Sequence, residues 1–76
     1  MRLLINGEAR EFEGELTLAT VVERLGMSAG RVAIELNGGI IARSAWADTA
    51  LHDGDRLEVV QFVGGGAASA GIVPPA

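Results

Sequence analysis

The chain has 76 residues and a mass of 7.8 kDa, which allows one small domain and excludes a second core. It has no cysteine and a single histidine, so the composition excludes thiol catalysis, disulfide bonds and thiolate metal sites. Ten acidic residues against six basic ones give a net charge of −4, the wrong sign for non-specific binding to nucleic acid. The basic residues are all arginines, so chemistry at a lysine amine is excluded as well.

Hydrophobicity gives no sign of a membrane protein. No apolar run approaches the roughly 20 residues that span a bilayer. The apolar stretch near the N-terminus is too short for a signal peptide and reaches a turn at once. We therefore expect a cytoplasmic protein with no membrane partner.

The first residues predict a β-hairpin. Residues 3–5 are β-prone, and Asn6 and Gly7 after them are a strong signal for a two-residue turn, because both tolerate a positive φ. We expect the return strand to cover residues 8–13 and to end at Gly14.

An amphipathic helix is predicted next. Its apolar residues recur at the spacing of one helix face: Leu18, Val21, Val22 and Leu25. Thr17 is the expected N-cap, and Gly26 is the expected left-handed residue after the helix. With about nine residues the helix is too short to be stable alone, so we expect it to pack on a sheet.

A second hairpin follows the helix. Alternating apolar residues predict a strand at residues 32–37. Asn37, Gly38 and Gly39 predict a tight turn, and residues 40–41 a short strand after it.

The remaining residues predict one more strand. Residues 43–50 are expected to be irregular or to form one helical turn, and residues 52–55 to form a turn. Residues 56–63 predict the last strand, with Leu57 and Val59 facing the core.

This order of elements predicts an α+β fold, in which one main helix packs across a mixed sheet. The first and last strands are expected to be neighbours at the centre of the sheet. That arrangement is the β-grasp, or ubiquitin-like, fold.

His52 with its neighbouring aspartates, and Trp46, each allow a functional and a structural interpretation. His52, with Asp53 and Asp55, could be a general base or a metal ligand, but metal sites need ligands from several segments. A solvated turn in which the aspartates cap backbone amides is favoured. Trp46 could anchor a ligand, but a cover for the edge of the core is favoured.

The end of the last strand gives the strongest functional signal. Val60 and Phe62 share the outward face with Glu58, and paired exposed apolar residues favour a partner site. The glycines at 64–66 lack the lysine and hydroxyl residue of a phosphate-binding loop, as do Gly38 and Gly39. Residues 64–66 are either a linker or a thin arm that enters a narrow channel in another protein.

Several segments together resemble the thiamin-biosynthesis sulfur-carrier proteins, the ThiS family. They are the Asn6-Gly7 hairpin, the helix start at Thr17-Leu18, Ala33-Ile34-Glu35-Leu36-Asn37, Arg43-Ser44-Ala45-Trp46, Asp53-Gly54-Asp55 and Val63-Gly64-Gly65-Gly66. The likeness covers residues 1–66, the expected ubiquitin-like domain, and residues 67–76 are expected to be a flexible extension. The Arg-x-x-Trp segment, followed by Asp-Gly-Asp and a strand that ends in glycines, favours this family over its relative, the small subunit of molybdopterin synthase.

The resemblance implies a carrier rather than an enzyme, with no cofactor bound by the chain itself. An E1-like adenylyltransferase uses ATP and Mg²⁺ to convert the terminal glycine carboxylate into an acyl-adenylate. Sulfur from a cysteine desulfurase or sulfurtransferase then displaces AMP, and the resulting thiocarboxylate donates sulfur to thiazole synthase. By position, Gly66 bears the thiocarboxylate and Gly65 is its small neighbour, while the partner-binding residues are Val60, Phe62, Val63 and Gly64.

The sequence departs from the family pattern after the glycines, where family members usually stop. Here Ala67 follows Gly66, so the Gly66 carbonyl belongs to an amide. Trimming by a protease is the favoured explanation; a remnant of fusion to a following enzyme and loss of the carrier function are the others. Sulfur delivery to molybdopterin, cysteine or tRNA, or a non-covalent ubiquitin-like binding module, are alternative functions.

Overall fold

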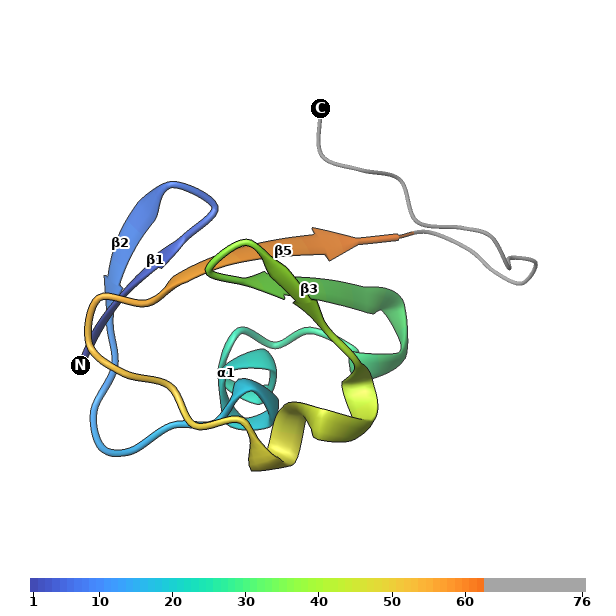
Figure 1. Ribbon diagram of the computed structural model, residues 1–76, viewed down its shortest axis with the longest axis horizontal. Helices are drawn as coiled ribbons and strands as arrows, with labels where there is room; N and C mark the ends of the chain where they lie inside the picture. Colours follow the sequence, from blue (N-terminus) through green and yellow to red (C-terminus); the bar gives the residue numbers. More distant parts are fainter. Residues whose placement is uncertain (63–76) are drawn as a thin grey trace.

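The computed structural model of the chain describes residues 1–62, in which one face of a mixed sheet carries a helix (Figure 1). The strand order of this five-stranded sheet is β2-β1-β5-β3-β4. In chain order the elements are β1 (Arg2–Ile5), β2 (Glu8–Glu11), α1 (Leu18–Arg24), the 3₁₀ helix η1 (Ala29–Arg31), β3 (Val32–Leu36), β4 (Gly39–Ile41), the 3₁₀ helix η2 (Arg43–Asp48) and β5 (Arg56–Gln61). The β-grasp fold expected from the sequence is confirmed.

Strand β5 lies at the centre of the sheet, between β1 and β3. It pairs in parallel with β1, where Leu4 lies opposite Arg56. It pairs antiparallel with β3, where Ile34 lies opposite Val59. The expected adjacency of the first and last strands is therefore confirmed, and the last strand joins the two hairpins into one sheet.

Both hairpins turn through an Asn-Gly pair with positive φ. Asn6 and Gly7 have φ values of 51° and 84°, and Asn37 and Gly38 have values of 50° and 93°. A type I′ turn needs positive φ at both central residues, and few other residue pairs tolerate it. Strand β2 ends two residues earlier than expected, although the Phe12 N–H still donates to the Met1 carbonyl at 2.9 Å.

Helix α1 has the predicted caps. The Thr17 side-chain oxygen accepts a hydrogen bond from the Thr20 N–H at 3.2 Å, which satisfies one donor of the first turn. Gly26 has a φ of 75°, as expected for the residue after the helix. The helix is shorter than the predicted nine or so residues because Thr17 and Leu25 are its caps rather than its first and last residues.

The core lies between α1, η2 and the inner face of the sheet. Trp46 on η2 is only 3% exposed, and its indole N–H donates to the Ile41 carbonyl at 3.0 Å. The structural role expected for Trp46 is therefore confirmed. The buried apolar residues are Leu3, Ile5, Leu16, Leu18, Val21, Val22, Val32, Ile34, Trp46, Leu51, Leu57 and Val59.

Strand β5 ends at Gln61, earlier than the predicted residue 63. Phe62 still joins the ladder, because its N–H donates to the Arg31 carbonyl at 2.9 Å. Val63 and the glycines at 64–66 lie outside the described residues. Within residues 1–62, no helix has the length and apolar character needed to cross a membrane.

Candidate partner-binding face

The sheet face opposite α1, here called the outer face, carries the side chains of alternate strand residues. On β5, Glu58 and Val60 point to this face, as the sequence predicts, since Leu57 and Val59 are buried on the other. Opposite them on β3 lie Glu35 and Ala33, and Ile40 on β4 lies opposite Glu35. The outer face therefore combines apolar and acidic side chains from three adjacent strands.

The most exposed apolar side chain on this face is that of Ile40. It is 71% exposed and is the one large apolar residue in the described part of the chain that is so exposed. Val60 and Phe62 are half-buried. The apolar part of the outer face is therefore centred on Ile40 and Val60. Sequence reasoning missed Ile40, although a two-residue apolar strand must place one residue outward if the other faces the core.

Phe62 lies at a shallow groove beside β4. The groove has a volume of about 280 Å³ and is lined by Ile40, Ile41, Trp46 and Phe62, with Arg43 and Gly30 among its other residues. Phe62 is also the last described residue before Val63 and the glycines. The groove thus lies where the chain leaves the sheet.

A second hollow, of about 310 Å³, lies over the central strand near the two Asn-Gly turns. Its walls include Leu4, Glu35, Arg56 and Glu58. Glu35 and Glu58 lie directly opposite each other in the antiparallel pairing of β3 and β5. Neither carboxylate forms an ion pair with another group of residues 1–62. Like charges in directly opposite positions of a sheet repel each other and destabilise it.

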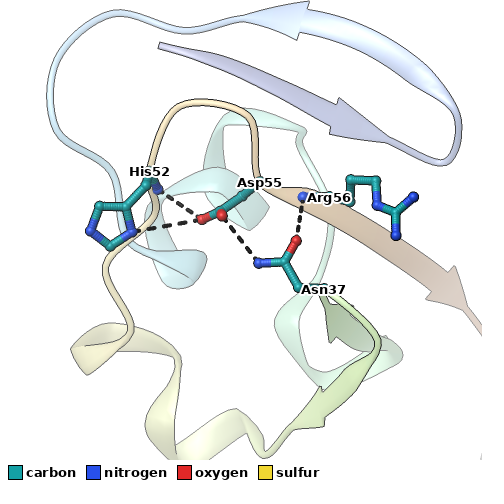
Figure 2. A network of polar contacts seen from close by, with 4 residues as sticks. All are labelled: Asn37, His52, Asp55 and Arg56. Carbon is teal, nitrogen blue, oxygen red and sulfur yellow. Dashed lines mark hydrogen bonds and ion pairs between the residues drawn. The ribbon is translucent and has the colours of Figure 1, made fainter.

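The turn at residues 52–55 is held by a polar network centred on Asp55 (Figure 2). One Asp55 carboxylate oxygen accepts from the His52 N–H at 2.8 Å, and the other accepts from the Asn37 side-chain amide at 3.1 Å. The Asn37 side-chain oxygen in turn accepts from the Arg56 N–H at 3.0 Å. The network thus fixes the start of β5 against the β3–β4 turn.

His52 joins this network through its backbone N–H and, at longer range, through its imidazole (Figure 2). Its imidazole is exposed and lies 3.9 Å from the Asp55 carboxylate. The Asp53 carboxylate accepts from the Arg2 N–H at 2.7 Å. The reading of this segment as a turn whose aspartates cap backbone amides is therefore confirmed. Among residues 1–62, no group of acidic residues and histidine is placed to hold a metal ion.

Comparison with known proteins finds both much longer relatives and relatives of about the same length as this chain. A thiazole synthase of Paramagnetospirillum magneticum is 43% identical over 70 residues, which cover 92% of this chain and 22% of that protein. The chain thus spans about a fifth of the length of that relative. The sulfur carrier protein ThiS of Thermus thermophilus is 40% identical over 62 residues, which cover 82% of this chain and 95% of that protein.

The fold has a counterpart among solved structures as well. The crystal structure of the thiamine biosynthesis protein ThiS from Geobacter metallireducens superposes with a TM-score of 0.75 at 35% identity, and the match covers 87% of this chain and all of that one. The model of the ThiS family matches residues 3–66. The chain therefore belongs to the ThiS family.

Proposed function

We propose that this chain carries sulfur as a thiocarboxylate on Gly66 and donates it for formation of the thiazole ring. The observation that carries the proposal is the extent of the family match, which runs from residue 3 to residue 66. The match ends at the third of three consecutive glycines, which follow the central strand, Phe62 and Val63. A carrier of this kind needs its reactive carbonyl beyond the folded sheet, where another protein can enclose it.

The chemistry requires a free acid at Gly66. A carboxylate oxygen attacks the α-phosphate of ATP, pyrophosphate leaves, and Mg²⁺ in the adenylyltransferase offsets the charge of the phosphates. The outer sulfur of a cysteine persulfide on a desulfurase or sulfurtransferase then attacks the acyl carbon, and AMP leaves. A thiol must then reduce the resulting acyl disulfide, which releases the thiocarboxylate and leaves the two other sulfur atoms joined in a disulfide. The part of this chain is to supply the acid on an arm without side chains, since Gly64 and Gly65 fit a channel that a Cβ atom would obstruct.

Docking on the E1-like adenylyltransferase is assigned to the residues around the start of the arm. Val60 is half-buried on the outer face beside Ala33, and Phe62 lines the groove next to β4. Both leave apolar surface for a partner to cover. Val63 and Gly64 follow directly in the sequence, so a partner that covers Val60 and Phe62 also meets them.

Thiazole synthase is the proposed sulfur acceptor. The relative from Paramagnetospirillum magneticum, itself called a thiazole synthase, contains a segment similar to this chain that accounts for 22% of its length. A carrier and an acceptor within one polypeptide are expected to act together. We place this reaction in the cytoplasm.

The residues after Gly66 must be removed before the carrier can act, and we propose that a protease cleaves after Gly66. The similarity to the Paramagnetospirillum protein covers 70 residues, which is more than residues 1–66 can supply. The similarity to that thiazole synthase therefore continues past Gly66. The peptide bond to Ala67 leaves the Gly66 carbonyl as an amide, and cleavage of that bond converts it into the acid.

Intact-mass measurement tests both parts of the proposal. After incubation with native cell extract, we expect a species that ends at Gly66. With the adenylyltransferase, ATP and a sulfur source, that species should gain the mass difference of one oxygen replaced by sulfur. The Gly66→Val variant should keep its circular dichroism spectrum and fail to gain this mass. A chain that always retains Ala76, or a Gly66→Val variant that is converted normally, would refute the proposal.

A further inference from the structure

Two glutamates on the outer face oppose each other without a cation between them. Glu35 and Glu58 are direct partners in the β3–β5 register. The Asn37 N–H donates to the Arg56 carbonyl at 2.8 Å, and the Phe62 N–H donates to the Arg31 carbonyl at 2.9 Å. Hydrogen-bonded and non-hydrogen-bonded pairs alternate along an antiparallel ladder, and these two bonds show which pairs are hydrogen-bonded. Glu35 and Glu58 are such a hydrogen-bonded pair, in which the Cα atoms lie about 5.5 Å apart. At that separation both carboxylates can contact one cationic group placed between them.

Within residues 1–62, neither glutamate has an ion-pair partner. Arg56 lies two residues before Glu58 on the same face and lines the same hollow, but it forms no ion pair with either glutamate in the described residues. The opposition of two like charges therefore weakens the sheet at its centre. A destabilising repulsion that no ion pair within the fold offsets is expected at a functional position.

The surroundings of the pair indicate what kind of group it receives. Ile40, 71% exposed, lies directly across from Glu35, and half-buried Val60 is next to Glu58 on the same strand face. The hollow of about 310 Å³ at the two glutamates is open on the outer face. A lysine or arginine side chain fits both features, because its aliphatic stem packs on apolar surface while its charged end reaches the carboxylates.

We propose that the outer face docks on a protein surface that inserts an arginine or lysine between Glu35 and Glu58 and covers Ile40 and Val60 with apolar side chains. This inference rests on the proposed function, within which the partner is the adenylyltransferase. Complementary charge in such an interface contributes to the choice of partner and speeds association. The net charge of −4 on this chain acts in the same direction.

Binding of the full chain to the adenylyltransferase of the same organism tests the inference, measured by isothermal titration calorimetry at low and at high salt. We expect the double variant Glu35→Gln, Glu58→Gln to bind roughly tenfold more weakly at low salt and to lose most of the salt dependence. Its urea midpoint should be equal to or above that of the unchanged protein, because the repulsion is removed. Ile40→Ser should weaken binding at both salt concentrations.

Glu23→Gln is the matched control, because Glu23 is exposed on α1, which covers the other face of the sheet. It removes one negative charge away from the outer face and should leave the affinity unchanged. Equal affinities of the double variant and the unchanged protein would overturn the inference, as would an equal loss in Glu23→Gln. In both cases binding by the unchanged protein would leave the proposed function standing. If the full chain does not bind, the same titrations are made with the chain that ends at Gly66, and failure of that chain to bind would contradict the proposed function itself.

Discussion

The side chain of Asn6 forms a reciprocal pair of hydrogen bonds with the backbone of Val59. The amide nitrogen donates to the Val59 carbonyl at 3.1 Å, and the amide oxygen accepts from the Val59 N–H at 2.8 Å. The Asn6 N–H also donates to the Leu57 carbonyl at 2.9 Å. Since β1 and β5 share only two paired positions, the side chain of this turn residue lengthens the central ladder by one step.

Changing Asn6 to aspartate should therefore destabilise the fold. Asn6→Asp keeps the acceptor for the Val59 N–H but replaces the donor with an oxygen that faces the Val59 carbonyl. Aspartate also tolerates the positive φ of 51° at this position, so the variant isolates the lost donor. We expect a loss of about 1–3 kcal/mol in the free energy of unfolding, measured by urea titration.

Gln61→Glu makes the same amide-to-acid change at an exposed position of β5, where the side chain forms no hydrogen bond within residues 1–62. It should alter stability by less than about 0.5 kcal/mol. Equal effects of the two changes would contradict the role given to the Asn6 amide.

The two residues that precede helices α1 and η1 give a matched pair of cap variants. The Thr17 side chain accepts from the Thr20 N–H, whereas the Ser28 side chain makes no capping bond. We expect Thr17→Ala to cost about 1 kcal/mol in thermal or urea unfolding and Ser28→Ala a few tenths at most. A larger loss for Ser28→Ala would refute this assignment of the caps.

Trp46→Phe should lower stability because it removes the indole N–H that satisfies the Ile41 carbonyl. The smaller ring also leaves unfilled volume in the core next to η2. We expect a loss of about 1–3 kcal/mol, followed by circular dichroism because the variant has no tryptophan. An unchanged melting temperature would show that neither the bond nor the packing of Trp46 matters.

Val60→Thr should weaken docking on the adenylyltransferase with little effect on the fold. Threonine keeps the shape and the β-branch of valine, but its hydroxyl must be desolvated under a partner. We expect the dissociation constant to rise roughly fivefold, equivalent to about 1 kcal/mol, in a calorimetric titration. Ala47→Ser, an exposed change on η2, is the control and should have no effect. A Val60→Thr variant that binds normally would remove Val60 from the proposed interface.

The fold could be predicted from the sequence where local chemistry determines geometry. Asn-Gly pairs set both turns, Thr17 and Gly26 set the helix ends, and the alternation of β5 set its buried face. The short helix η1 was not predicted, because a three-residue 3₁₀ turn has no periodic pattern.

The site was less predictable because it depends on register between distant strands. The opposition of Glu35 and Glu58 follows from the pairing of β3 with β5, which neither strand specifies alone. The bonds between Asn6 and Val59 join residues 53 positions apart, so they depend on the completed topology.

Within residues 1–62, β5 is the last strand in the sequence and the middle strand of the sheet. Before the ribosome has added residues 56–61, the hairpins β1–β2 and β3–β4 have no strand between them and cannot share a core. The outer face is therefore complete only when β5 is in place, immediately before the residues that lead to the glycines.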